Sequence, residues 1–185
     1  NNTGRMAVIL PNGALYRKGA ESKIRQALLE QFILDAVIGL GANIFYGTPV
    51  PVCLMVFKKE KDAVKKDKVL FIDASEMGYM KDRVHRDLSE EDIKLITDTY
   101  HNWRKSENYH NIKGFCKSAT IEEIQKHNHV LTPGRYVGIE DTEDDGISFE
   151  DKVAVISENL KSHFEQSIEL QERIKLNLKK VGIEL

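Results

Sequence analysis

Short apolar runs and one helical pattern alternate in the first third of the chain. The run over residues 5–10 ends at Pro11-Asn12-Gly13 and has the length and flanks of a strand buried on both faces. Residues 21–32 then place apolar side chains on one helical face, namely Ile24, Ala27, Leu28 and Phe32. Apolar runs over 34–40 and 52–57 predict two more strands. This order predicts an α/β fold in which the helix packs on one face of a sheet.

The connection between the second and third strands is short and carries turn residues. Residues 41–51 include Gly41, Gly47, Pro49 and Pro51, and they are too few for a crossover helix. The two strands are therefore expected to be antiparallel neighbours within a mostly parallel sheet.

The middle of the chain continues the same alternation. Residues 69–72 predict a fourth strand, and the polar, irregular residues 76–87 are expected to cross an edge of the sheet. Ser89 and Asp92 stand at the two positions of a capping box. They predict the start of a helix whose apolar face runs to Trp103, which we expect to anchor the core.

A short edge strand and a short helix follow. Residues 115–119 predict the strand, and Thr120 with Glu123 forms a second capping-box pattern. His127 and His129 have no third ligand nearby in the sequence, so no metal site is predicted.

The last part of the chain has a different composition. Residues 140–145 are acidic and predict a break, and residues 148–182 carry apolar side chains at steps of three and four. Such a long amphipathic helix either packs on its own domain or pairs with a partner helix. We expect two parts, residues 1–139 and a helical tail over 140–185.

Charge, cysteine content and the length of apolar runs limit the classes of protein to which this chain can belong. Its 185 residues carry a net charge of −2, whereas a stand-alone duplex-DNA binder usually has a basic excess. Cys53 and Cys116 lack metal-binding spacing and predict free thiols in a reducing cytoplasm. No apolar run approaches the length of a membrane span.

Four segments in order resemble a known family. They are GRMAVILPNGALYRKGAESKIRQALLE, AVIGLGANIFYGTPVPVCLMVFKK, VLFIDAS and IEEIQKHNHVLTPGRYV. Together they resemble the adenine-N6 DNA methyltransferases, most closely the modification subunit of type I restriction-modification systems. The resemblance implies the C-terminal half of a Rossmann-like S-adenosylmethionine-dependent methyltransferase sheet, with an antiparallel hairpin and a helical tail.

The resemblance also implies an activity for the parent protein. Such enzymes transfer a methyl group from S-adenosylmethionine to adenine N6 at specific sites in double-stranded DNA. They use a Gly-rich turn for the cofactor and an Asn/Asp-Pro-Pro-Phe/Tyr motif for the amino group, and neither occurs here. We expect both motifs upstream of Asn1, so that this C-terminal fragment contains no catalytic residue and is inactive alone.

Four residues are candidates for the target-base site. The family places an aromatic side chain in the loop before the last strand of the hairpin, and Phe45 matches that position, with Tyr46 beside it. Stacking of this kind holds an extruded base. Asn12 and Gly13 follow the first strand and form a turn or a pocket wall.

Some cations are weaker candidates for DNA contact. Arg5, Lys18 and Arg25 could contact phosphate, although no sequence pattern singles them out. The lysine-rich residues 58–68 predict a solvated turn or a further phosphate contact.

The family resemblance also implies partner subunits. In type I systems a specificity subunit reads the DNA sequence and a restriction subunit cleaves, and the modification subunit's tail packs on helices of the specificity subunit. Double-stranded DNA is then bound through the full complex. An isolated half sheet has an unpaired edge strand, so self-association of the fragment is also expected.

Two alternative functions stay open. The chain could be a non-catalytic interaction scaffold that recruits a partner through its long helix. It could also belong to a single-chain restriction–methylation enzyme, in which the tail leads to a target-recognition domain.

Overall fold

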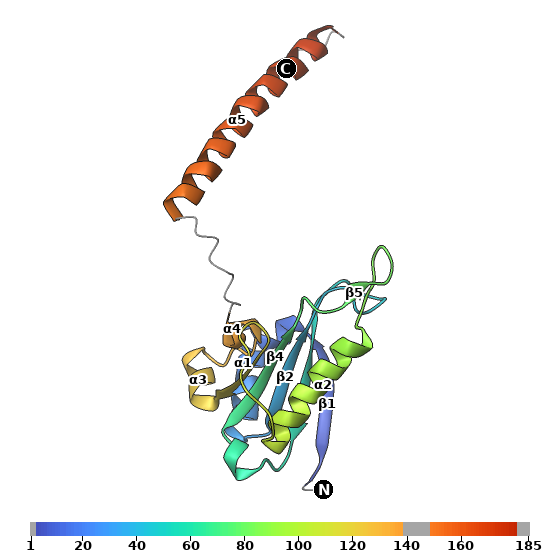
Figure 1. Cartoon of the computed structure of the whole chain (residues 1–185), viewed down its shortest axis with the longest axis vertical. Coiled ribbons are helices and arrows are strands. Elements are labelled where there is room, and N and C mark those ends of the chain that lie inside the picture. The colour runs from blue at the N-terminus through green and yellow to red at the C-terminus, as the bar shows by residue number, and fades with distance from the viewer. Residues whose placement is uncertain (1–2, 139–148, 181–185) are drawn as a thin grey trace. The chain divides into compact units, whose positions relative to one another are not determined.

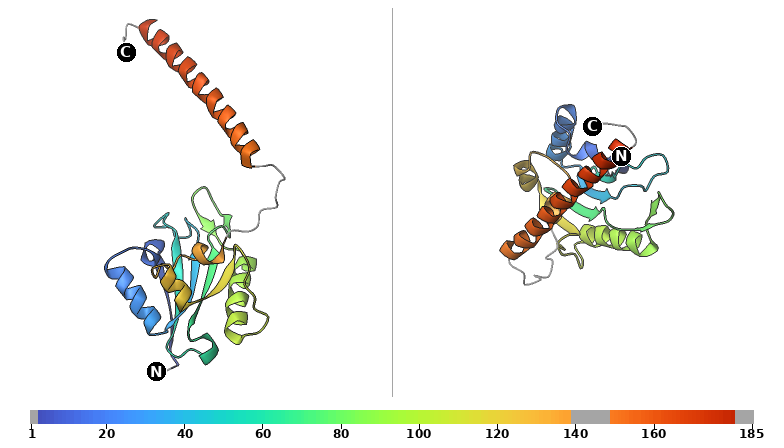
Figure 2. Two further views of the ribbon diagram at one scale, coloured as in Figure 1. Left: turned by 90° about the vertical axis from the view of Figure 1, so that its left-hand side faces the viewer. Right: turned by 90° about the horizontal axis from the view of Figure 1, so that it is seen from above.

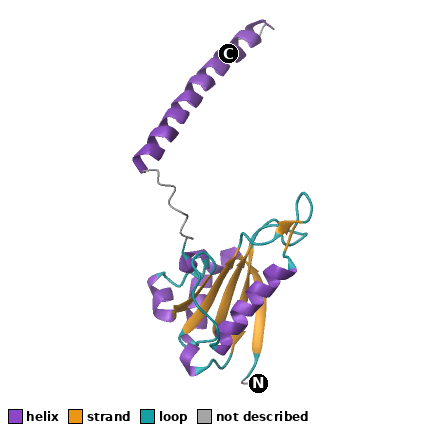
Figure 3. Cartoon of the chain, in the orientation of Figure 1, coloured by secondary structure: helices purple, strands orange, loops and turns teal. Residues whose placement is uncertain are grey.

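The computed structural model describes residues 3–138 and 149–180, in two compact units that divide after Glu140. The first unit holds a five-stranded sheet in the order β1-β3-β2-β4-β7 (Figures 1 and 3). Its strands are β1 Arg5–Pro11, β2 Leu34–Leu40, β3 Val52–Lys58, β4 Lys68–Ala74 and β7 Cys116–Thr120.

The pairing of β3 confirms the predicted antiparallel neighbours and adds a detail. β3 is antiparallel both to β2 and to β1, and it lies between them. β2 and β4 are parallel, and β7 closes one end of the sheet antiparallel to β4, as expected for an edge strand. β1, β2 and β4 therefore run in the same direction and end at the same edge.

Helices cover both faces of this sheet. α1 (Ala20–Glu30), α3 (Ile121–Lys126) and α4 (Gly134–Val137) contribute to the hydrophobic cluster on one face. α2 (Glu90–Lys105) contributes to the cluster on the other face, and Figure 2 shows α1 and α2 on opposite sides. Along β4, Val69 and Phe71 join the first cluster and Leu70 and Ile72 the second, which explains its uninterrupted apolar run.

Local signals were accurate for α2. Ser89 and Asp92 form the complete capping box, and Trp103 is buried with its Nε1–H donating to Ser118 Oγ at 2.9 Å. At α3 only half of the predicted box forms. Thr120 accepts from the N–H of Glu123, whereas the Glu123 carboxylate pairs with Lys117 at 2.6 Å.

Two burial predictions were wrong. β1 is not buried on both faces: it lies at an edge of the sheet formed by the described residues, and Met6 and Ile9 are 56% and 51% exposed. In α1 the predicted apolar face is only partly buried: Ile24 is exposed, Leu28 and Phe32 are half-buried, and the buried residues are Arg25 and Leu29.

Four short elements complete the described part of the first unit. They are two 3-10 helices, η1 (Asn12–Leu15) and η2 (Ala63–Lys65), and a two-stranded hairpin, β5 (Tyr79–Met80) and β6 (Arg86–Asp87). The hairpin corrects the expectation of an irregular crossing over residues 76–87.

The described part of the second unit is one helix, α5 (Phe149–Lys180). Its large apolar side chains are exposed at Val153, Ile156, Leu160, Phe164, Ile168, Leu170 and Ile174. The acidic break and the ends of the predicted helix, residues 148, 181 and 182, lie outside the described residues. No helix among the described residues is long and apolar enough to cross a bilayer.

Candidate functional site

The candidate site lies at the edge where the three parallel strands end. η1 follows β1 there, the loop over residues 41–51 follows β2, and Asp73 to Ser75 close β4. Ligands of open α/β sheets bind outside the carboxyl ends of the strands. The structure therefore brings the four predicted site residues to one edge, in two neighbouring segments.

The loop over residues 41–51 is anchored on both sides. On one side the N–H of Asn12 donates to the carbonyl of Pro51 at 3.1 Å. On the other side the N–H of Arg86 donates to the carbonyl of Asn43 at 2.9 Å. Gly41 allows the close approach, since a Cβ there would lie 2.5 Å from the carbonyl oxygen of Ser75. The loop is thus held between the end of β1 and the β5–β6 hairpin.

Phe45 and Tyr46 are both available on this anchored loop. Phe45 is 39% exposed as a whole residue, and its backbone carbonyl accepts from the N–H of Thr48 in a tight turn. Tyr46 is 75% exposed, with its ring centroid 4.1 Å from that of His85 on the hairpin. Phe45 is therefore partly accessible at this edge, whereas Tyr46 already packs against His85 of the hairpin.

Asn12 and Gly13 form the turn after β1. The carbonyl of Gly13 accepts from the N–H groups of Tyr16 and Arg17, and Gly13 is buried. The side-chain Oδ1 of Asn12 is buried without a hydrogen-bond partner among the described residues. The two residues border the foot of the Phe45 loop through the bond to Pro51.

The β5–β6 hairpin is the part of this edge that sequence patterns missed. Its turn is organised by Asp82, whose carboxylate accepts from the N–H groups of Val84 and His85 at 2.8 Å and pairs with His85 Nδ1. These hydrogen bonds, that from Val84 first, lower the pKa of Asp82 to about 2. Gly78, at φ +91°, and Asp82 were the available turn signals.

Arg25 does not contact phosphate, contrary to one expectation. It is 3% exposed, and its guanidinium donates to the carbonyls of His129, Ala14 and Arg17 at 2.9, 3.0 and 2.8 Å. Burial, partly offset by Glu21, lowers the pKa of Arg25. Its role is structural: it ties the turn after β1 to the segment before α4.

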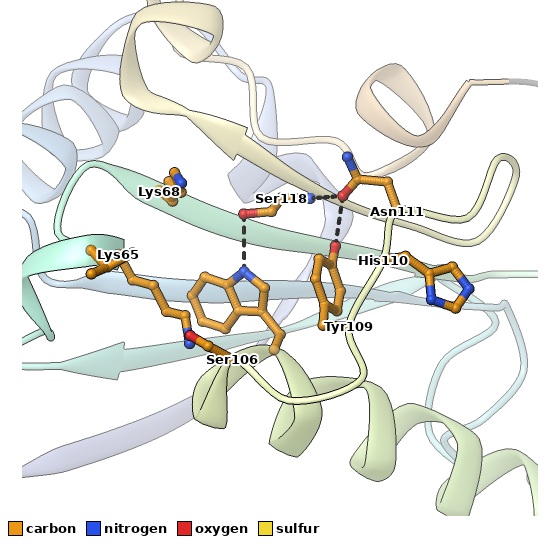
Figure 4. A pocket seen from close by; sticks show the side chains of 9 residues that line it. Lys65, Lys68, Ser106, Tyr109, His110, Asn111 and Ser118 are labelled. Atoms are coloured by element: carbon orange, nitrogen blue, oxygen red, sulfur yellow. Dashed lines mark hydrogen bonds between the residues drawn. The ribbon is translucent and has the colours of Figure 1, made fainter.

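A hollow of about 410 Å³ lies at the other end of β4, beside Lys68 (Figure 4). Its polar groups are largely paired with one another. Tyr109 OH and the Ser118 N–H both bond to Asn111 Oδ1 at 2.9 Å, and Lys65 donates to the carbonyl of Arg104 at 2.7 Å. Lys65 is buried, so part of the lysine-rich connection is neither solvated nor available to DNA. This hollow is far from the carboxyl edge and is best explained as packing.

The residues present do not fit a complete cofactor site. The first strand is followed by Pro11-Asn12-Gly13 rather than by a Gly-rich turn that opens a helix. The four prolines stand at 11, 49, 51 and 133, so the sequence contains no Pro-Pro pair for the amino-group motif. Among the described residues, no cluster of three or more His, Cys, Asp or Glu is suited to a metal ion.

The fold and this edge define a class of protein: the distal half of a Rossmann-like methyltransferase sheet, with an antiparallel strand inserted between two parallel ones. The chain belongs to the N-6 DNA methylase family, whose model matches residues 1–145. This confirms the family resemblance of the four sequence segments.

Individual relatives agree with this assignment. The type I restriction enzyme HindI methylase subunit of Haemophilus influenzae is 42% identical over 98% of this chain and 41% of its own length. A type I methyltransferase subunit from Streptococcus thermophilus gives a TM-score of 0.64 at 36% identity, over 73% of this chain and 27% of that one. The chain thus spans less than half the length of these relatives.

A further solved structure supports the fold alone. It comes from work on the complex assembly and conformational transition of a type I restriction-modification system. It covers 97% of this chain and 37% of its own, with a TM-score of 0.57 at 18% identity.

Proposed function

We propose that this chain is the target-base side of a site-specific adenine-N6 DNA methyltransferase, the modification subunit of a type I restriction-modification system. In this proposal the whole protein methylates adenine N6 in double-stranded DNA in the cytoplasm. The observation that carries the proposal is the 42% identity to a type I methylase subunit along 98% of the chain.

In this proposal the functions needed for methyl transfer are divided between this chain and the rest of the protein. S-adenosylmethionine supplies the methyl group, and the motifs that hold it and the amino group belong to residues outside this sequence. This chain contributes a wall against which the extruded adenine is held, because an enzyme that modifies a base must take it out of the stack.

Phe45 is the residue that we assign to base stacking. It is partly exposed at the carboxyl edge, and its loop is anchored at Asn43 and at Pro51. A loop whose backbone is anchored loses little conformational entropy when its ring stacks on a base, which favours binding. Tyr46 is the weaker candidate because its ring already contacts His85, and Asn12 with Gly13 would line the adjoining wall.

We also propose specific partners for the C-terminal unit. α5 exposes apolar side chains along about six turns, and an exposed stripe of this kind marks an interaction surface. The proposed partner is a helix of the DNA-specificity subunit, in an assembly that also binds a restriction subunit.

The direct test measures adenine methylation. The complete modification subunit with its specificity subunit is expected to form N6-methyladenine in duplex DNA, and the 185-residue chain alone is expected to form none. Absence of N6-methyladenine from the complete assembly, with its upstream motifs intact, would contradict the proposal.

The exposed stripe of α5 also favours a second candidate function, a non-catalytic scaffold. In that case the chain binds a specificity subunit equally well, yet no parent protein with methyltransferase motifs exists. Sequencing the parent reading frame upstream of Asn1 separates the two. A single-chain enzyme would show a target-recognition domain downstream instead.

A further inference from the structure

The β5–β6 hairpin and the Phe45 loop form one unit at the carboxyl edge. The N–H of Arg86 bonds to Asn43 in the loop, and the His85 ring lies against Tyr46. The Arg86 guanidinium donates to the carbonyl of Met77 at 3.1 Å, which fixes the base of the hairpin. Figure 1 shows the hairpin extending beyond the ends of the strands at this edge. A base held by Phe45 would bring its duplex close to the hairpin.

The charged side chains of the hairpin have hydrogen-bond or ion-pair partners, with one exception. Lys81 pairs with Asp87 at 3.1 Å, and Asp82 is occupied by His85 and by two backbone N–H groups. Arg83 is exposed in the turn, and its guanidinium has no partner among the described residues. Both acids thus have partners inside the hairpin, and the Arg83 cation is left exposed in its turn.

The hairpin also has large apolar side chains that are exposed to solvent. Met80 on β5 and Val84 in the turn are 50% and 58% exposed. Proteins that distort DNA insert apolar side chains of this size between base steps. Arginine beside such a wedge matches a backbone phosphate.

We propose that the β5–β6 hairpin is a second DNA contact beside the extruded adenine, with Arg83 on a backbone phosphate and Met80 and Val84 against the opened base stack. This inference rests on the proposed function, and it names a contact outside the base pocket. Extrusion of the target base exposes the faces of the neighbouring bases. The apolar side chains pack against these faces and so stabilise the opened duplex. The phosphate contact sets the position of the hairpin on the duplex.

The charge contact is tested with Arg83→Gln in the complete enzyme, using fluorescence anisotropy of a labelled duplex over a range of salt concentrations. Loss of one phosphate contact is expected to reduce the slope of log affinity against log salt by about 1. Arg83→Lys should restore the slope. Lys94→Gln, an exposed cation of α2, is the matched control and should leave it unchanged. A wild-type slope for Arg83→Gln overturns the charge contact.

The apolar contact is tested with the double variant Met80→Ser/Val84→Ser and a duplex that carries 2-aminopurine at the target adenine. The rise in fluorescence on extrusion is expected to be about fivefold smaller than in the unaltered enzyme. Ile93→Ser/Leu95→Ser, an exposed apolar pair on α2, is the matched control. An unchanged fluorescence rise in the hairpin variant overturns the wedge.

The outcomes separate this inference from the proposed function. If the unaltered complete enzyme methylates adenine while both hairpin variants bind and extrude like it, the inference fails and the function stands. If the unaltered enzyme does not methylate adenine, the proposed function fails, and the salt slopes still report on the hairpin. If the variants lose a protein subunit instead of DNA affinity, the hairpin is a protein interface and the inference is wrong.

Discussion

At the scale of single residues, Phe45 offers the most direct test of the base site. Phe45→Ala in the complete enzyme removes a partly exposed ring from a loop anchored at both ends, so the fold should persist. Stacking contributes about 1–3 kcal/mol per base, so kcat/KM for methylation is expected to fall by about 5- to 150-fold.

Tyr46→Ala is the matched control for this prediction. It removes a neighbouring aromatic ring of the same loop that already packs on His85, so a smaller loss of activity is expected. Full activity of Phe45→Ala, or a larger loss for Tyr46→Ala, would reject Phe45 as the stacking residue.

Arg25 gives a second prediction at this scale, for stability. Lysine cannot reproduce three charged hydrogen bonds to the carbonyls of His129, Ala14 and Arg17, each contributing about 1.5–3 kcal/mol. Arg25→Lys should therefore lower the free energy of unfolding by about 2–4 kcal/mol. Urea titration of the chain measures it, with the exposed Arg135→Lys as control. A difference between the two variants below the error of the titration would show that the buried bonds do not stabilise the fold.

Residue-scale features were predictable where their partners are close in sequence. Ser89 and Asp92 are three residues apart, so their capping box could be found from the sequence. Arg25 bonds to His129, which is 104 residues away, and no local pattern reveals this. Glu123 fits a capping box locally, yet Lys117 on β7 pairs with it.

At the scale of elements, α5 carries a prediction about assembly. Leu160→Ser/Phe164→Ser should weaken association with the specificity subunit by about tenfold or more, because central apolar residues dominate such interfaces. Calorimetric titration of the two subunits measures the affinity, and circular dichroism checks that the helix persists.

The opposite side of the same helix provides the control for that prediction. Glu158→Ser/Glu165→Ser changes two residues away from the apolar stripe and should leave the affinity unchanged. Equal affinities for the apolar variant and the unaltered subunit would show that the stripe is not the docking surface.

Elements were predictable where chain length limited the choices. The loop over residues 41–51 is too short for a crossover, so antiparallel pairing of β2 and β3 followed from the sequence. The β5–β6 hairpin was missed because its strands are two residues long. Such strands are too short to show an alternation of apolar and polar residues. The burial of β1 was wrong because an apolar run does not reveal whether its strand has one neighbour or two.

At the scale of the whole molecule, the exposed β1 predicts self-association of the isolated chain. Its only sheet partner among the described residues is β3, and Met6 and Ile9 are exposed on it. Edge strands of this kind pair with other chains, so dimers or aggregates are expected by light scattering at high concentration.

A charged residue on the edge provides the control for that prediction. Ile9→Lys should reduce the association, as natural edge strands carry lysine to prevent pairing, whereas Ile93→Lys on α2 should not. A monodisperse monomer of the unaltered chain would contradict the prediction.

The position of β3 between β1 and β2 also sets the timing of folding during synthesis. Arg5 pairs with Lys58 and Pro11 with Val52, so β1 leaves the ribosome well before the strand that it pairs with. At 5–20 residues per second, this interval is about 2–10 s. For that time a hydrophobic strand has no β3 to pair with, which makes it a natural client for chaperones that bind nascent chains.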